Sequence, residues 1–320
     1  MSDLGVIIVT WNTRELTLQT LQSLYADLAT VALSVRVLVV DNASDDGSVK
    51  AVQAQFPQAE VLTSDVNLGF GGANNLGMRY FGFGKADATD LPKAIYLLNS
   101  DTVTQPGATE ALYQALFSAP DVGLVGAHLT YGDGSFQDGA FSFPGLRQMW
   151  AEFFWIPGRL RLGRFNGRYP EEAYVSGEPF DVDFTLGATM MLRQDVIRQT
   201  GMFDSETFFM YCEEIDWAWR IKRAGWRVLC VPRAHVVHLA GQSTKQVKPR
   251  SVINLWESRL KLMDKYYPAW KRWLGRRLVA VGMRYKLQQL LAQPANQERD
   301  AIQVAYEHVI ALAEGRSSDA

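Results

Sequence analysis

The amino-acid sequence predicts an α/β protein with a mainly parallel central sheet flanked by helices, followed by a C-terminal helical extension. In the first third of the chain, short apolar runs rich in β-branched residues alternate with segments whose apolar residues recur every three or four positions. That alternation is typical of strand–helix–strand units. A polar or glycine-rich stretch follows each apolar run, where the strands of open α/β sheets present ligand-binding loops.

Strands are expected where apolar residues are continuous, because a parallel strand covered on both faces needs no polar side. The expected strands span residues 6–10, 35–40, 60–63 and 94–98. Helices are expected between them. Residues 15–26 carry apolar side chains at helical spacing, a second helix runs through Val49 and stops before Pro57, and a third begins in the glycine-rich sequence NLGFGGANNLG.

The rest of the chain adds one helix, a short strand and three further helices. The first helix is expected to begin at the acids Glu213, Glu214 and Asp216 and to continue through Ile221, and the short strand precedes His238. The last three helices are predicted at 251–267, 269–291 and 298–314. We therefore expect an α/β domain over residues 1–244 and an amphipathic helical region over residues 245–320.

Composition restricts the classes of protein to which the chain can belong. Its 320 residues are 48% hydrophobic and 21% charged, as in a folded globular protein. Cys212 and Cys230 are too few for a disulfide framework or a four-cysteine zinc site, and they fit a reducing compartment. No apolar run reaches the roughly 18 residues of a membrane-spanning helix. A cytoplasmic location is therefore expected.

Charge is distributed unevenly along the chain. Residues 1–244 have a net charge of −9, residues 245–290 hold 12 basic and 2 acidic side chains for a net charge of +10, and residues 291–320 have −3. A basic segment on an acidic body indicates an anionic partner, either nucleic acid or the cytoplasmic face of a lipid bilayer. No nucleic-acid-binding motif accompanies the charge, so nucleic acid is not expected. The alternative is a solvated helix face.

The loops after the predicted strands carry the first candidate ligand-binding residues. Neither GxGxxG after the first strand nor GxxxxGK[ST] occurs, so a nucleotide has to bind without these phosphate-binding loops. Asp41 can accept a hydrogen bond from a base N–H or a ribose hydroxyl, and Asp101 can hold Mg²⁺ or Mn²⁺ at a diphosphate. The alternative for each aspartate is a turn or capping role. The four loops read TWN (10–12), DNAS (41–44), NLGFGG (67–72) and NSD (99–101).

An acidic cluster and a histidine in the second half are further candidates. Three acids open a predicted helix after an aromatic run, and they are Glu213, Glu214 and Asp216. Acids in a first turn complement the helix dipole, which is one explanation. The other is that aromatic neighbours restrict water and raise the pKa of a carboxylate that serves as a general base. His235 is expected to be structural, whereas His238 is a metal-ligand candidate together with Asp101.

Seven motifs together resemble those of the inverting GT-A glycosyltransferases of family 2. Within that family the chain looks like the rhamnosyltransferases of bacterial surface polysaccharide and O-antigen assembly. The motifs come in the family's order and cover residues 4 to about 244. They read VIIVTWN, VLVVDNASDDGS, NLGFGGANNLGM, LLNSDT, GATMMLRQDV, GMFDSETFFMYCEEIDWAWR and VVHLAGQST. The resemblance implies the GT-A fold for the α/β domain, which would be the catalytic domain.

The resemblance also implies a role for each candidate residue. Asp41 would recognise the base of a nucleotide sugar, and Asp101, at the last position of the family's DxD motif, would bind the metal with His238. Glu214 would be the catalytic base, and Glu213 is the alternative, because the pair reads Glu-Glu where the family usually has Glu-Asp. The other donor-site candidates are Thr10, Asn12, Asn42, Gly69, Asn75, Asn99 and Ser100.

Two positions depart from a simple assignment. Asn99 stands where the first DxD aspartate would be, so it either hydrogen bonds to ribose or coordinates the metal weakly. Asp216, grouped with the catalytic acids, lies four residues before Arg220, and the two side chains alternatively pair on the helix surface.

The implied reaction is a metal-dependent sugar transfer with inversion at the anomeric carbon. An acceptor hydroxyl is a poor nucleophile until a carboxylate takes its proton, which requires one base. Negative charge builds on the leaving diphosphate, where a divalent cation, Mg²⁺ or Mn²⁺, stabilises it. The expected donor is dTDP-L-rhamnose. The alternatives are a UDP-linked hexose donor, or a catalytically inactive relative that only binds a nucleotide sugar or glycan.

The C-terminal extension is expected to concern the acceptor and the membrane. The predicted helices at 251–267 and 269–291 combine tryptophan with basic side chains, as does segment 149–165. Such segments suit a membrane interface, and packing on the catalytic domain is the alternative. We expect a peripheral position on the inner face of the cytoplasmic membrane, an anionic lipid surface as partner and a lipid-linked or polysaccharide acceptor. The last helix either docks on the body or forms a homodimer.

Overall fold

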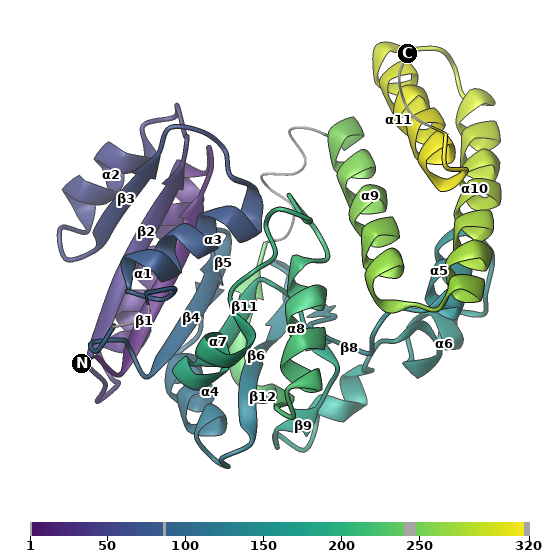
Figure 1. Cartoon of the computed structure of the whole chain (residues 1–320). Coiled ribbons are helices and arrows are strands. Elements are labelled where there is room, and N and C mark those ends of the chain that lie inside the picture. The colour runs from purple at the N-terminus through teal and green to yellow at the C-terminus, as the bar shows by residue number, and fades with distance from the viewer. Residues whose placement is uncertain (1, 86–87, 240–247, 317–320) are drawn as a thin grey trace.

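The computed structural model describes residues 2–85, 88–239 and 248–316, and it shows an α/β unit with a group of C-terminal helices at one side (Figure 1). The main sheet contains β1 (Leu4–Thr10), β2 (Val35–Asn42), β3 (Glu60–Ser64), β4 (Ala94–Asn99), β5 (Thr102–Thr104), β6 (Val122–Thr130), β7 (Phe136–Gln137), β9 (Phe180–Asp181), β11 (Thr189–Arg193) and β12 (Arg227–His238). Its strand order is β3-β2-β1-β4-β11-β6-β12-β5, with β7 paired to β6 and β9 to β12. A small second sheet pairs β8 (Ala140–Phe141) with β10 (Phe184–Thr185).

Helices flank the main sheet and form the C-terminal part. They are α1 (Arg14–Leu28), α2 (Ser48–Gln55), α3 (Gly69–Tyr80), α4 (Ala108–Leu116), α5 (Leu146–Phe153), α6 (Gly158–Arg161), α7 (Gln194–Thr200), α8 (Glu213–Arg223), α9 (Lys248–Tyr266), α10 (Ala269–Leu291) and α11 (Gln297–Ala313). Two 3-10 turns are η1 (Arg164–Asn166) and η2 (Glu171–Tyr174). The expected α/β fold with a mostly parallel sheet, flanking helices and a C-terminal helical part is confirmed.

The strands of the first half are apolar on both faces because helices cover both faces. Ile8 of β1 is buried in a cluster with Leu21 of α1, whereas its neighbour Ile7 is buried in a second cluster with Met78 of α3. β1 pairs in parallel with β2 on one side and β4 on the other. The carboxyl ends of these three strands therefore meet at one edge of the sheet, where the polar loops predicted to bind ligands come together.

Two strands of the second half go beyond the sequence-based expectation. β11 lies antiparallel between β4 and β6, so the sheet is mixed. The short strand expected before His238 is the long β12, which continues past Pro232 because a register shift before His235 interrupts its pairing with β6. At its end His238 pairs with Thr102 of β5, which brings the histidine next to Asp101.

The C-terminal helices share a core with α5. Trp256 of α9, Val279 of α10 and Val309 of α11 are buried in one cluster with Phe153 of α5. α11 therefore docks on helices of its own chain, which is one of the two alternatives for this segment. The expected boundary between residues 244 and 245 lies outside the described residues, as does the end of the last motif, 240–244. Within the described ranges, no helix is both long and apolar enough to cross a bilayer.

Candidate active site

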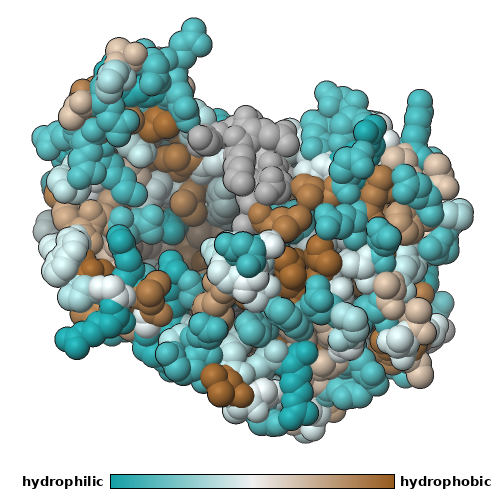
Figure 2. Space-filling model, turned by 180° about the vertical axis from the view of Figure 1, so that it is seen from behind, coloured by the Kyte–Doolittle hydropathy of each residue, from teal (hydrophilic) through white to brown (hydrophobic). Residues whose placement is uncertain are grey.

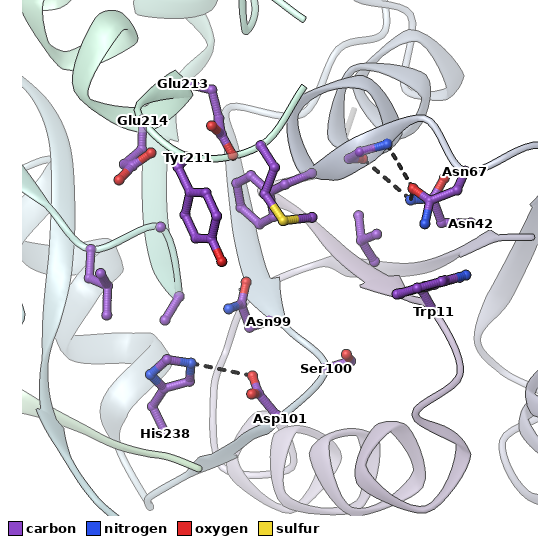
Figure 3. A pocket seen from close by; sticks show the side chains of 17 residues that line it. Trp11, Asn42, Asn67, Asn99, Ser100, Asp101, Tyr211, Glu213, Glu214 and His238 are labelled. Atoms are coloured by element: carbon purple, nitrogen blue, oxygen red, sulfur yellow. Dashed lines mark hydrogen bonds and ion pairs between the residues drawn. The ribbon is translucent and has the colours of Figure 1, made fainter. Parts of the chain in front are cut away.

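A pocket of about 270 Å³ opens where β1, β2 and β4 end (Figure 3). Segments distant in sequence complete it, namely the loop before α8 and the end of β12. In Figure 3, Asp101 and His238 lie together on one side of the pocket, with Trp11 and Asn42 at another end and Glu214 beyond Tyr211. The predicted site residues that line it are Asn42, Gly69, Asn99, Ser100, Asp101, Glu213, Glu214 and His238.

An amide network between β2 and α3 builds one end of the pocket. Asn42 Nδ2 donates to Asn67 Oδ1 at 3.0 Å and to the Gly69 carbonyl at 3.3 Å, and Asn42 Oδ1 accepts from the Leu68 amide at 2.8 Å. Gly69 has φ +72°, and a Cβ atom there would overlap the carbonyl oxygen of Phe209. Glycine is therefore required for the close approach of the glycine-rich loop to the loop before α8.

Asp41 is not among the residues that line the pocket, although its neighbour Asn42 is. The side chain is buried, and its Oδ2 accepts from the Ser44 amide at 3.1 Å. Its Oδ1 has no hydrogen-bond partner among the described residues. A buried carboxylate oxygen without a donor is costly, so this atom is suited to receive an N–H or O–H from a ligand.

Three other predicted donor-site residues also lie outside the pocket lining, because protein groups occupy their side chains. Thr10 is hydrogen-bonded to Thr17 at 2.8 Å, Asn12 Oδ1 accepts from the Asp45 amide at 2.9 Å, and Asn75 Oδ1 accepts from the Phe203 amide at 3.0 Å. Asn75 also donates to the Phe203 carbonyl at 2.8 Å. These hydrogen bonds join β1 to α1, the loop after β1 to the loop after β2, and α3 to the loop before α8.

Asp101 and His238 form a pair suited to a divalent cation. His238 Nε2 lies 3.3 Å from Asp101 Oδ1, and His238 Nδ1 lies 3.2 Å from Gln137 Oε1. In the tautomer with the proton on Nδ1, the ring donates to Gln137 Oε1 and leaves the Nε2 lone pair free for a cation shared with Asp101. Carboxylate and imidazole are a donor set that Mn²⁺ accepts, and the Gln137 contact fixes the ring as an outer-shell partner does. In the part of the chain that the structure describes, no group of three or more His, Cys, Asp or Glu is arranged to hold a metal ion.

Asn99 and Ser100 continue the pocket floor beside Asp101. Asn99 lies at the end of β4 below the ring of Tyr211, and its backbone amide donates to the Ala188 carbonyl at 3.0 Å (Figure 3). Ser100 Oγ lies 3.2 Å from Thr13 Oγ1. An amide at position 99 keeps hydrogen-bonding capacity without charge, so Asp101 supplies the only carboxylate of the NSD sequence.

The two glutamates at the start of α8 differ in exposure. Both line the pocket, but Glu213 is 3% exposed and its Oε2 has no partner among the described residues, whereas Glu214 is partly exposed. Burial, and then the charge of Glu214, raises the pKa of Glu213 well above its usual value. Burial raises the pKa of Glu214 to about 7. Glu214 is thus accessible and poised near neutral pH, as a general base requires.

The backbone before the two glutamates is strained. Tyr211 and Cys212 have φ angles of +70° and +67°, a left-handed conformation that costs an L-residue about 1–2 kcal/mol. The Tyr211 ring projects into the pocket between Glu214 and Asn99, while Cys212 is buried (Figure 3). This turn starts α8 so that Glu214 reaches the pocket.

Asp216, predicted among the catalytic acids, does not line the pocket. Its carboxylate is fully buried and binds Arg220 Nε at 3.0 Å, Lys265 Nζ at 2.7 Å and the Tyr266 hydroxyl at 2.6 Å. The pairing with Arg220 that the spacing allowed is present, but in the interior rather than on the helix surface. With both oxygens engaged by donors, Asp216 acts as an anchor for α8.

Some pocket residues were missed by sequence reasoning. Trp11 lies between the two predicted residues of TWN, Asn67 begins the glycine-rich loop and Tyr211 lies just before the acid pair, so their motifs contained the necessary signal. Gln137 lies in no motif, and only the pairing of β7 with β6 brings it to His238. His235, expected to be structural, lies within β12 with its Nε2 3.1 Å from Thr130 Oγ1.

Comparisons with known proteins found sequence relatives among the glycosyltransferases. The family model described as "Glycosyltransferase like family 2" matches residues 2–261. A relative named N-acetylglucosaminyl-diphospho-decaprenol L-rhamnosyltransferase, from Mycobacterium tuberculosis, is 31% identical over 219 residues, which are 66% of this chain and 68% of the relative. The rhamnosyltransferase WbbL of Escherichia coli is 39% identical over 80 residues, 25% of this chain and 29% of WbbL.

Solved structures share the fold. A mannosyltransferase of Pyrobaculum calidifontis, in complex with GDP-Man and Mn²⁺, aligns with a TM-score of 0.57 at 16% identity over 99% of this chain and 88% of its own. GalNAc-T7 with UDP, GalNAc and Mn²⁺ aligns with a TM-score of 0.53 at 15% identity over 74% of this chain and 43% of its own.

Proposed function

The chain belongs to glycosyltransferase family 2 and is a hexosyltransferase with the GT-A fold, and from that premise we propose that it transfers L-rhamnose from dTDP-L-rhamnose to a lipid-linked glycan with inversion. The observation that carries the proposal is the convergence of Asp101, His238 and Glu214 on one pocket, although they lie far apart in the sequence. A cation-binding pair and a general base on one pocket are what a single displacement requires.

Glu214 provides the base. The acceptor hydroxyl oxygen attacks the anomeric carbon, its proton passes to a Glu214 carboxylate oxygen, and the bond from the anomeric carbon to the diphosphate oxygen breaks with its electron pair staying on the diphosphate. Attack from the face opposite the leaving group inverts the anomeric centre, and no enzyme nucleophile is needed. Glu213 is buried beside Glu214, and burial together with the charge of Glu214 raises the pKa of Glu213 and disfavours its charged form.

Asp101 and His238 would hold the divalent cation together with the diphosphate of the donor. The fit rests on the facing of Asp101 Oδ1 and His238 Nε2 at 3.3 Å. When bound, the cation neutralises the charge that develops on the leaving diphosphate. Asn99 offers the amide expected to hydrogen bond to the ribose. The Mn²⁺ in the complexes of the two structural neighbours supports a divalent ion.

The choice of a thymidine nucleotide rests on the relatives and on Asp41. Both curated relatives described above are rhamnosyltransferases by name. The unpartnered Asp41 Oδ1 suits the N3–H donor of thymine, and Asp41 directly precedes Asn42, which lines the pocket together with Trp11. Uracil carries the same donor, so a UDP-hexose remains the competing donor.

Exposed side chains of the C-terminal helices and of α5 suit contact with a lipid surface. Trp270 and Trp273 of α10 are 60% and 62% exposed, and Lys271 and Arg277 lie over their rings at 5.5 and 5.7 Å. On α5, Met149 and Phe153 pack inward while Trp150 is exposed. Figure 2 shows apolar residues along a hollow beside the C-terminal helices. Exposed tryptophan next to cations is typical of an interface with anionic lipid, and we propose a peripheral position on the inner face of the cytoplasmic membrane.

A transfer assay tests this function. The protein is incubated with a polyprenyl-diphosphate-linked N-acetylglucosamine acceptor and dTDP-L-rhamnose, UDP-glucose or UDP-galactose, with Mn²⁺, Mg²⁺ or EDTA. The proposal expects rhamnose transfer that requires the ion, with NMR of the product showing the anomeric configuration opposite to the donor's. Transfer of a UDP-sugar but not of rhamnose would show that dTDP-L-rhamnose is not the donor. Retained configuration would exclude the inverting mechanism, and donor binding without transfer would indicate a catalytically inactive member of the family.

A further inference from the structure

One helix of the C-terminal part holds the segment that carries the two glutamates. We call residues 204–216 the acidic loop. Lys265 of α9 contacts both ends of this loop, since its Nζ lies 2.7 Å from Asp204 Oδ2 and 2.7 Å from Asp216 Oδ1. Ser258, earlier on α9, donates from its hydroxyl to the Met210 carbonyl at 2.8 Å. α9 therefore spans the loop from its start to its end.

Apolar contacts join the same two surfaces. Phe208 and Cys212 of the acidic loop are buried in one cluster with Leu262 of α9. The ring of Tyr266 stacks on Trp219 of α8, with centroids 4.4 Å apart and an interplanar angle of 7°. The Tyr266 hydroxyl donates to Asp216 Oδ1 at 2.6 Å, so stacking and hydrogen bonding fix the start of α8 against α9.

The acidic loop needs such support because its conformation is unfavourable in isolation. Two consecutive L-residues, Tyr211 and Cys212, are left-handed directly before Glu213. Glu213, which is buried, and the partly buried Glu214 also lie side by side at this place, which disfavours their charged forms. Strained backbone persists only where the surroundings over-determine it. The contacts from α9 are constraints of that kind.

We propose that α9 positions the catalytic carboxylate, with Ser258, Lys265 and Tyr266 holding the acidic loop in the conformation that brings Glu214 into the pocket. The assignment of Glu214 as the base rests on the proposed function, whereas the anchoring itself is independent of donor and acceptor. The three side chains are positioning residues, because they act through Asp216 and the Met210 carbonyl and are not among the residues that line the pocket.

Cys212 reports on the anchoring without any substrate. It is 3% exposed against α9, and Cys230 in β12, 0% exposed, is a reference thiol in the same chain. In the full-length protein, Tyr266→Phe and Lys265→Met are expected to raise the rate of Cys212 alkylation by iodoacetamide about tenfold, because each removes a bond to a buried carboxylate. Cys230, measured in the same samples by peptide mass spectrometry, should keep its rate. Lys261→Met removes an exposed charge one turn earlier on α9 and should change neither rate.

Kinetics separate positioning from general stability. The Tyr266→Phe and Lys265→Met variants are expected to lower kcat about tenfold or more while the donor KM changes less than about twofold, since the donor end of the pocket is untouched. Lys265→Arg keeps the charge and is expected to restore most of the kcat lost in Lys265→Met. Melting temperatures for all variants identify any that unfold.

Several results would overturn the proposal. Unchanged Cys212 alkylation in both variants would show that α9 does not hold the loop. Alkylation rising equally at Cys230 would mean that the whole chain has loosened. A kcat that stays at the wild-type value despite faster Cys212 alkylation would remove the link to catalysis. If no donor is transferred even by the wild type, while Cys212 alone becomes reactive in the variants, the proposed function fails and the anchoring stands.

Discussion

Replacing Glu214 with glutamine is expected to stabilise the protein at pH 8 but hardly at pH 5. Burial raises the pKa of this carboxyl from its usual 4.5 to about 7. A group whose pKa is higher in the folded than in the unfolded chain stabilises the fold at low pH, and this contribution is lost as the pH rises from 4.5 through 7. Glutamine has nearly the same shape and does not titrate, so the variant does not lose stability as the pH rises.

The magnitude follows from the two pKa values. The difference between 4.5 and about 7, at roughly 1.4 kcal/mol per pKa unit, gives a cost of roughly 3 kcal/mol at pH 8. Because Glu214 is partly exposed to the pocket, solvent screening reduces this figure, and we expect about 1–3 kcal/mol. Loss of the charge also relieves Glu213, whose raised pKa depends partly on Glu214, and that effect has the same sign.

Urea unfolding followed by circular dichroism at pH 5 and pH 8 measures the effect. Glu206→Gln is the matched control, because Glu206 is exposed on the same loop and its replacement removes one carboxylate from solvent. The expected result is a gain for Glu214→Gln that is larger at pH 8 than at pH 5, together with a loss of kcat of about 100-fold or more. A variant as stable as the wild type at both pH values, or less stable at pH 8, would refute the reasoning about burial.

Four further outcomes are expected. The rate of transfer should fall below about pH 7 as Glu214 binds a proton, and a rate that is flat from pH 5 to pH 8 would assign the base elsewhere. Asp101→Asn should abolish the Mn²⁺-dependent part of the thermal stabilisation by dTDP, and an undiminished Mn²⁺ effect would place the ion at another site. Gly69→Ala should cost about 1–3 kcal/mol in urea unfolding and raise the donor KM, because its Cβ meets the Phe209 carbonyl; a variant with unchanged KM would show that the loops need not touch. Replacing Trp270 and Trp273 together by alanine should weaken sedimentation with anionic liposomes about tenfold or more, and unchanged binding would exclude that face of α10.

The first half of the sheet was predictable because its strands are buried on both faces. Runs such as residues 6–10 and 35–40 are then apolar throughout, and local sequence alone identifies them. The length of β12 was not predictable, since Pro232 indicates a strand break, whereas in the structure the pairing with β6 resumes at His235 after a register shift. The antiparallel direction of β11 likewise depends on long-range pairing.

The candidate site was predictable where a motif coincides with the end of a strand or the start of a helix. Asp101 and Glu214 reach the pocket as expected from their motifs. Asp216 was not separable from its neighbours by sequence, because its burial depends on Lys265 and Tyr266, about 50 positions further along the chain. The contact between Gln137 and His238 could not be predicted either, because it depends on long-range pairing of a strand of only two residues, β7.

The convergence of a cation site and a base on one donor pocket is tested most directly by a crystal structure with dTDP and Mn²⁺. We expect an anomalous peak that places a manganese ion between Asp101 and His238. We also expect the thymine N3–H within hydrogen-bonding distance of Asp41, and the β-phosphate on the side of the pocket that faces Glu214. Manganese bound away from this pair, or a nucleotide whose diphosphate points away from Glu214, would contradict it.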